Sequence, residues 1–378
     1  MAFQTKFGAN SIPEPPVGRI TALDRARGIA ILGMIVENYV TVIYGWSRDG
    51  INLAGGIIDA LSHLFSRMLE GRSAPLFVIL AGMGLSLMTS RGRENADAPI
   101  LSRKRRTVMK RALFLFCVGM AFMLIWPPDI LHYFGCYFAI GALLITASNK
   151  KLLGGALFFV LGFVILFLVL DYYRDWDWET LTYPGLWTGV LPLIKNLFFN
   201  GFHPIFPWTA FFLFGMWLGR QKLDSAGFSR GLIVIGLILV IVLEAASGLS
   251  SLFSSPSSRI GEFLFTEFFP PLPGYILSTG ASASLIIGLM LLLEDSGGRS
   301  RRPGPLAATG QLSLTVYLAH VIVGMGVLET IGRLEHQTIG FALLSAGIFC
   351  VVSVAFAFVW RRTFDRGPFE ALMRWIAG

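Results

Sequence analysis

The sequence predicts an all-α protein, a polytopic bundle of about ten membrane-spanning helices. Hydrophobic side chains make up 54% of the 378 residues, whereas Asp, Glu, Lys and Arg make up only 14%. An ordinary soluble domain carries about a quarter charged residues. Apolar runs of about 17 to 25 residues, long enough to cross a bilayer as a helix, recur along most of the chain. Soluble enzymes are therefore excluded, and so are β-barrels, whose strands alternate apolar and polar residues.

Ten apolar runs are predicted to cross the membrane, and together they form a single transmembrane domain over residues 28–360. A cytoplasmic segment, 1–27, precedes this domain, and a cytoplasmic tail, 361–378, follows it. The predicted spans are 28–47, 73–90, 112–127, 130–148, 152–170, 204–219, 231–248, 273–293, 307–327 and 339–360.

The distribution of positive charge predicts the orientation of this bundle. With the N-terminus placed inside, the inner segments contain 24 of the 31 Lys and Arg residues, in agreement with the positive-inside rule. We therefore expect both termini in the cytoplasm of a multi-pass protein of the inner, or plasma, membrane. The net charge of +8 then reflects orientation, so the lipid bilayer rather than nucleic acid is the expected partner. The sequence leaves a monomer and a homodimer open.

The first predicted span contains two adjacent polar residues, Glu37 and Asn38. At 1.5 Å per residue Asn38 lies about 15 Å from Gly28, near the middle of the membrane. Ionisable and polar groups at this depth are expensive and mark functional sites by default. Hydrogen bonding between helices is the alternative interpretation for Asn38.

Residues 51–70 follow the first span on the outer side and are predicted to form an amphipathic helix. Asp59, His63 and Arg67 are spaced four residues apart and so share one helical face. A carboxylate one turn from an imidazole can select its tautomer and raise its basicity. The spacing therefore indicates His63 as a general base oriented by Asp59. An interfacial helix with a solvated polar stripe is the alternative.

The other histidines offer no metal site, because no pair has the spacing of metal ligands. His132, His203 and His336 are expected near the outer face, and His320 inside the ninth span. On the inner side, residues 103–106 form a basic run that either marks the topology or receives the phosphates of an anionic donor.

Motifs distributed from residue 19 to residue 370 resemble those of YeiB-like (DUF418-type) membrane proteins. Asp24, Arg27 and Gly28 directly precede the first span, which carries a mid-span Asn. The other matching segments are 129–135, 206–208 with Gly215 and Gly219, and 366–370. This family is in turn similar to the heparan-alpha-glucosaminide N-acetyltransferases, which move an acetyl group from cytoplasmic acetyl-CoA to a sugar amine across a membrane.

The resemblance implies a membrane acyltransferase whose donor substrate is acyl-CoA, with acetyl-CoA expected. The acceptor would be a hydroxyl or amine of a sugar or small molecule on the outer side. The acetyltransferases have an Asn in the first span and a catalytic His shortly after it, and Asn38 and His63 match these by position. Together with the patterns described above, the expected catalytic residues are His63, Asp59 and Asn38. The expected donor-binding residues are Arg27, Arg105 and Arg106, with pinning of the first helix to Asp24 as the alternative role of Arg27. The expected acceptor-binding residues are Glu37, His132, His203 and Trp208.

Two other functions are compatible with the sequence. In a small-solute transporter or exporter, Glu37 and the outer histidines would couple transport to proton movement. A structural or regulatory membrane protein would need only the helix-packing glycines, such as Gly82 and Gly84 or Gly215 and Gly219.

Overall fold

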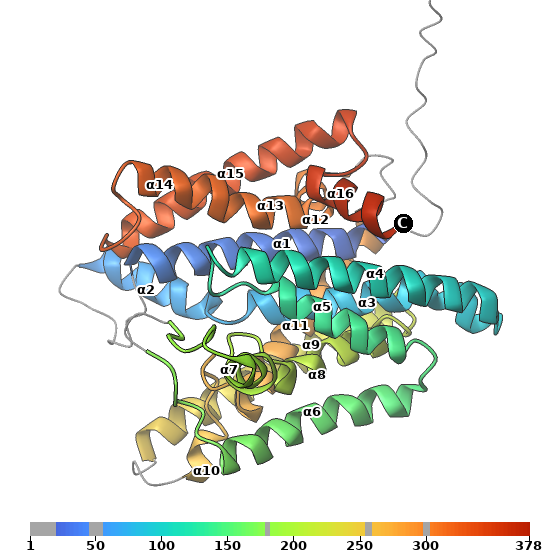
Figure 1. Cartoon of the computed structure of the whole chain (residues 1–378), viewed down its shortest axis with the longest axis horizontal. Coiled ribbons are helices and arrows are strands. Elements are labelled where there is room, and N and C mark those ends of the chain that lie inside the picture. The colour runs from blue at the N-terminus through green and yellow to red at the C-terminus, as the bar shows by residue number, and fades with distance from the viewer. Residues whose placement is uncertain (1–19, 45–55, 178–181, 254–258, 298–302) are drawn as a thin grey trace, which may run out of the picture.

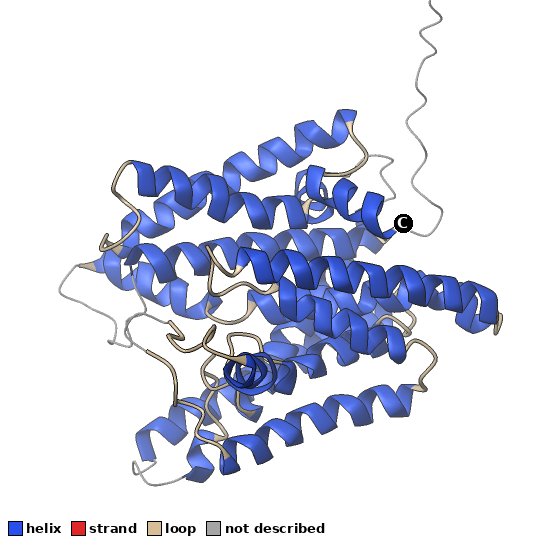
Figure 2. Cartoon of the chain, viewed as in Figure 1, coloured by secondary structure: helices blue, strands red, loops and turns tan. Residues whose placement is uncertain are grey.

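The computed structural model describes residues 20–44, 56–177, 182–253, 259–297 and 303–378 (Figure 1). These residues form helices and turns (Figure 2), and the described part of the chain contains no β-structure beyond an isolated bridge between Asp177 and Thr182. Residues 1–19 of the predicted cytoplasmic segment lie outside the described residues. The predicted class, a helical membrane bundle, is confirmed.

The helices are named in chain order, with η marking π-helical turns. The first half contains α1 (Thr21–Tyr39), η1 (Val40–Tyr44), α2 (Ile57–Leu69), α3 (Ser73–Glu94), α4 (Ala98–Phe122), α5 (Leu131–Leu143), α6 (Asn149–Val169), α7 (Val190–Lys195), η3 (Asn196–Asn200) and α8 (Ile205–Leu218). The second half contains α9 (Ala226–Phe253), α10 (Arg259–Glu262), α11 (Pro273–Gly297), α12 (Pro305–Gln311), α13 (Ser313–Ala319), η4 (His320–Met325), α14 (Gly326–Thr330), α15 (Ile339–Thr363) and α16 (Pro368–Ala377).

By length and composition, seven helices of the described residues can cross a membrane, or eight if the bent pair Val190–Asn200 and Ile205–Leu218 is one span. The predicted spans 112–127 and 130–148 correspond to the C-terminal half of α4 and to α5. The N-terminal half of α4 is highly charged, and α5 has only 13 residues. The count of ten spans and the cytoplasmic position of both termini stay predictions.

Helix α1 lies at the centre of the bundle (Figure 1). It lies between α12 and α15 on one side and α3 and α11 on the other. It packs against α3, α11, α12 and α15, so its residues are buried around most of its circumference. By contrast, only Leu152 and Phe163 of α6 are buried. Glu37 and Asn38 of α1 are therefore half-buried among packed helices, whereas α6 leaves most of its apolar side chains exposed, as expected for a helix that faces lipid.

Glycines bring α3 and α8 into backbone contact. A Cβ atom at Gly82 would collide with the backbone of Phe212, and one at Gly215 with the backbone of Ile79. These contacts confirm the packing interpretation for both residues. Gly84 differs, because a Cβ atom there would lie 3.8 Å from the guanidinium group of Arg27, which is an ordinary contact distance.

We expect Gly215→Ala to destabilise the protein by about 1–3 kcal/mol, because the added methyl group forces two backbones apart. The matched control is Gly154→Ala in α6, where a Cβ atom meets no heavy atom within 4 Å. This control should be neutral or stabilising by up to about 1 kcal/mol, because Ala favours a helix over Gly. Thermal unfolding of the purified variants in detergent measures both effects, and equal midpoints would contradict the close contact.

Candidate active site

Glu37 and Asn38 connect α1 to two different neighbours. One carboxylate oxygen of Glu37, Oε1, accepts hydrogen bonds from the Ser73 hydroxyl (2.7 Å) and the Ser73 backbone N–H (3.3 Å) at the start of α3. The Asn38 amide nitrogen lies 3.0 Å from Nε2 of His320, the first residue of η4. The helical segments α1, α3 and η4 therefore meet at this pair of polar residues.

A buried polar cluster continues from His320 toward α5. The Tyr317 hydroxyl, one turn before His320, donates to Asp129 Oδ1 (3.0 Å) and accepts from the Ile130 N–H (3.2 Å). Asp129 Oδ2 lies 2.9 Å from His132 Nδ1. Tyr317, Asp129, His132 and His320 are all buried. The cluster thus contains a carboxylate–imidazole pair, Asp129–His132, which orients a histidine in the way that was predicted for Asp59 and His63.

The predicted acceptor-binding residues His132, His203 and Trp208 form a continuous aromatic cluster. The Tyr133 ring lies 3.9 Å from the His132 ring and 5.9 Å from the His203 ring, measured between centroids. The His203 ring packs edge-on against Trp208 at 4.6 Å. These side chains are buried, so they line the interior of the bundle rather than its outer surface.

His63 lies on α2 beside Tyr44 at the end of η1. Its Nε2 atom is 3.5 Å from the Tyr44 hydroxyl, and the two rings meet edge-on with centroids 5.4 Å apart. No hydrogen bond joins Asp59 to His63 within the described residues. Tyr44 is six residues beyond Asn38, which corresponds to about 9 Å along a helix axis. His63 therefore lies beyond the Asn38 cluster, toward the C-terminal end of η1, which is the predicted outer side.

The apolar face of α2 does not pack into the bundle. Its large side chains are exposed, which is typical of a helix that lies at a membrane interface. They are Ile57, Leu61, Leu64, Phe65 and Met68.

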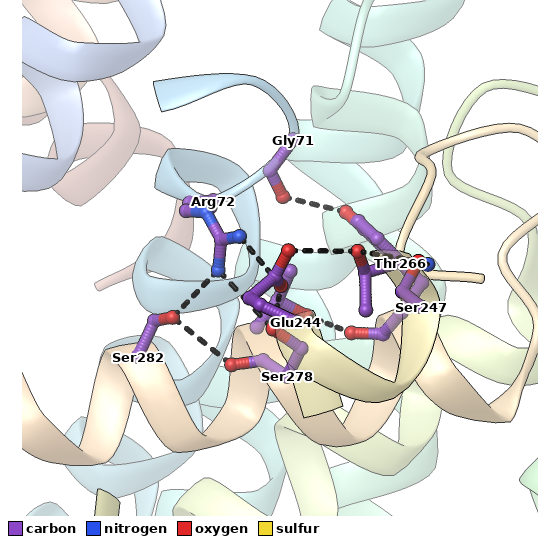
Figure 3. A network of polar contacts seen from close by, with 9 residues as sticks. Gly71, Arg72, Glu244, Ser247, Thr266, Ser278 and Ser282 are labelled. Carbon is purple, nitrogen blue, oxygen red and sulfur yellow. Dashed lines mark hydrogen bonds and ion pairs between the residues drawn. The ribbon is translucent and has the colours of Figure 1, made fainter. Parts of the chain in front are cut away.

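The junction between α2 and α3 is anchored by a polar network (Figure 3). Arg72 donates to Glu244 Oε1 of α9 (2.8 Å) and to the hydroxyls of Ser282 (2.8 Å) and Ser278 (3.2 Å) of α11. The Tyr275 hydroxyl donates to the Gly71 carbonyl (2.6 Å). This network holds the C-terminal end of the helix that carries His63.

Sequence reasoning missed the network and the Asn38–His320 pair. Glu244 was a visible signal, because it is a single carboxylate within an apolar run, and Asp129 lies three residues before His132. Their partners are distant in the chain and could not be recognised by spacing.

The three arginines predicted to bind the donor have different surroundings. Arg27 pairs with Asp24 at 3.0 Å, and Asp24 also accepts from Gln311 (2.9 Å). Arg105 Nε donates to the Ala142 carbonyl near the end of α5 (3.0 Å), and Arg106 is exposed. Arg27 and Arg105 thus have structural contacts, and the role of all three in donor binding stays a prediction.

A family model described as heparan-alpha-glucosaminide N-acetyltransferase, catalytic, matches residues 19–231, more than half of the chain. The chain belongs to this family. A second family model, described as a protein of unknown function (DUF418), matches residues 217–378, which confirms the resemblance to YeiB-like proteins. No curated protein sequence matches the chain.

The two matches divide the candidate site of this acetyltransferase-family protein. Asn38, His63 and His132 lie in the first matched segment, whereas Glu244 and His320 lie in the second. The catalytic-family match indicates a membrane acetyltransferase-like function. The Asn38–His320 hydrogen bond joins the two matched segments within one site.

We expect Arg72→Ala to lower the free energy of unfolding by about 1–3 kcal/mol, because it leaves Glu244 without its charged partner. Adding Glu244→Gln to this variant should recover part of the loss, because an uncharged amide needs no counter-charge. Arg67→Ala, which removes an exposed arginine of α2, is the control. Thermal unfolding of the four proteins tests this, and a double variant less stable than Arg72→Ala would contradict the assignment.

Proposed function

We propose that the protein is an integral membrane acyltransferase. It transfers an acyl group, expected to be acetyl, from cytoplasmic acyl-CoA to a hydroxyl or amine of a sugar or small molecule on the outer side of the inner membrane. The single observation that carries this proposal is the catalytic-family match over residues 19–231, which includes both Asn38 and His63. The buried polar cluster around Asn38 supports it, because such clusters in membrane helices mark functional sites.

Asn38 would hold the reacting carbonyl group of the donor. Its amide can donate a hydrogen bond to the thioester oxygen, which becomes more negative as the acceptor attacks. A hydrogen-bond donor that points at the negative charge developing in the transition state accelerates acyl transfer, and it does so most strongly in a site of low dielectric constant. The central position of α1 supports this role, because packing against α3, α11, α12 and α15 holds the backbone that carries Asn38 in place.

His63 would act as the general base on the outer side. The acceptor oxygen or nitrogen forms a bond to the acyl carbon, its proton passes to His63, and the carbon–sulfur bond breaks. CoA leaves as a thiolate that takes up a proton. Because His63 is only half-buried, it remains within reach of an acceptor arriving from outside, and Asp59 and Tyr44 are the groups available to orient it.

The acceptor would contact Glu37 and the aromatic cluster of His132, His203 and Trp208. Aromatic rings with polar edges suit a ligand that carries both hydroxyl groups and an apolar face. The donor phosphates would bind Arg27, Arg105 and Arg106 at the inner end, where guanidinium groups pair well with phosphate.

Transport of a small solute is the second candidate, favoured by one observation. The bent pair Val190–Asn200 and Ile205–Leu218 turns by 47°, and interrupted helices in membrane proteins often line a binding site. In that case proteoliposomes would move solute without consuming acyl-CoA.

The direct test measures transfer of labelled acetyl from acetyl-CoA to a panel of sugars, amino sugars and small amines by the purified protein. We expect His63→Ala to lower the transfer rate by about 100- to 10,000-fold, the usual cost of removing a general base, with acetyl-CoA affinity near wild type. Asp59→Asn should cost less, because the imidazole remains. His336→Ala, at an exposed outer position, is the control, and full turnover by His63→Ala would exclude His63 as the base.

Replacing Arg105 and Arg106 together with Ala should weaken acetyl-CoA binding without changing acceptor preference. Lost phosphate pairing should also make the residual binding less sensitive to salt. The matched control replaces Arg103 and Lys104, which removes the same charge from the same run. Titration calorimetry at two salt concentrations measures acetyl-CoA affinity. An equal loss of affinity in both double variants would show that Arg105 and Arg106 contribute only the general positive charge of this run.

A further inference from the structure

Asn38 and His320 face each other where two helices change from α to π geometry. Asn38 is the penultimate residue of α1, which continues into η1 at Val40. His320 is the first residue of η4, directly after α13. Short π-helical segments are rare in proteins, and those that occur are often at functional sites. They redirect side chains relative to a regular α-helix.

The contacts of His320 determine its tautomer. Its Nδ1 atom lies against the Tyr317 carbonyl oxygen, and a carbonyl oxygen can only accept, so Nδ1 carries a proton. His320 is fully buried, and no ion pair of the described residues involves its ring. The neutral imidazole is therefore favoured, because a buried charge needs a partner. The lone pair of this neutral ring is on Nε2, which faces Asn38.

This tautomer in turn selects one orientation of the Asn38 amide. The oxygen and nitrogen of an amide group have nearly the same shape, so only hydrogen-bond partners distinguish the two orientations. Because Nε2 of His320 can only accept, the NH₂ group of Asn38 must point toward it. One N–H is used by His320, and the second remains for a ligand. Asn38 itself is only half-buried, and His320 is the single hydrogen-bond partner of its amide nitrogen among the described residues.

Two further contacts restrain the His320 side of this pair. The Trp126 ring packs edge-on against the His320 ring, with centroids 5.8 Å apart. The Tyr317 hydroxyl is held by Asp129 (3.0 Å). Both Trp126 and Asp129 belong to the turn between α4 and α5, so this turn contacts the residues on either side of the π-helical junction.

We infer that His320 is the positioning residue for the donor thioester: it fixes the Asn38 amide so that an N–H group, and not the amide oxygen, faces the thioester carbonyl. This inference rests on the proposed function. Without His320 the amide could rotate and present its oxygen to the carbonyl oxygen, which is repulsive. His320 needs no contact with the substrate to have this effect.

The test compares two ligands, acetyl-CoA and S-ethyl-CoA, which differ in the carbonyl oxygen. A neutral hydrogen bond contributes about 0.5–1.5 kcal/mol, so wild type should bind acetyl-CoA roughly two- to twelve-fold more tightly than the thioether. Equilibrium binding of both labelled ligands to detergent-purified protein measures this ratio and needs no acceptor substrate.

We expect His320→Leu to reduce the ratio to about one without changing the affinity for S-ethyl-CoA. The conservative variant His320→Gln should keep the ratio, because its side-chain oxygen can accept from Asn38. Asn38→Ala should also give a ratio near one, and adding His320→Leu to it should change nothing more. A merely structural role would instead weaken the binding of both ligands together.

The outcomes distinguish a failure of the proposed acyltransferase function from a failure of the positioning role of His320. A wild-type protein that binds neither CoA compound would overturn the proposed function and this inference with it. A wild type that prefers acetyl-CoA, combined with a His320→Leu variant that keeps the preference, would overturn the positioning role alone. Loss of the preference for acetyl-CoA in His320→Gln would also overturn the positioning role. A hydrogen-bond acceptor at position 320 would then not be enough to orient the Asn38 amide.

Discussion

Two adjacent polar side chains within a buried helix impose the main constraint on this bundle. Glu37 and Asn38 cannot remain without partners in an environment of low dielectric constant. Successive residues of a helix point about 100° apart, so their partners must lie on neighbouring sides of α1. Ser73 and His320 satisfy them, and this requirement places the start of α3 and the start of η4 against the same turn of α1.

The α2–α3 junction extends this constraint to the helix that carries His63. Gly71 has a positive φ of 68°, a conformation that glycine adopts without strain. A Cβ atom there would also lie tightly against the rings of Tyr275 (3.0 Å) and Phe268 (3.1 Å). The next residues, Arg72 and Ser73, connect the chain to α9, α11 and α1. The position of His63 thus depends on contacts made just beyond the C-terminal end of α2.

The functional interpretation rests on a composite site. Residues of the catalytic-family segment supply Asn38 and the predicted base, whereas the segment of the second family supplies the group that satisfies Asn38. Either segment alone would leave a polar group of the cluster without its partner. The two segments therefore meet at one polar cluster, and the contacts that stabilise the bundle there also orient the groups proposed to bind the donor.

The sequence by itself determined the fold class, because a bilayer responds to hydropathy and charge that accumulate along short runs of chain. It also identified Glu37 and Asn38, since polar residues in an apolar run are visible without a structure. Only the tertiary structure decided the pairings: Asp59 and His63 share a helical face, yet His63 contacts Tyr44, while Asp129 and His132 form the carboxylate–imidazole pair. Likewise, Arg72 meets Glu244 and Asn38 meets His320 across long stretches of sequence. Spacing determines which side chains of one helix can share a face, whereas partners on different helices depend on how glycine contacts and buried hydrogen bonds arrange those helices together.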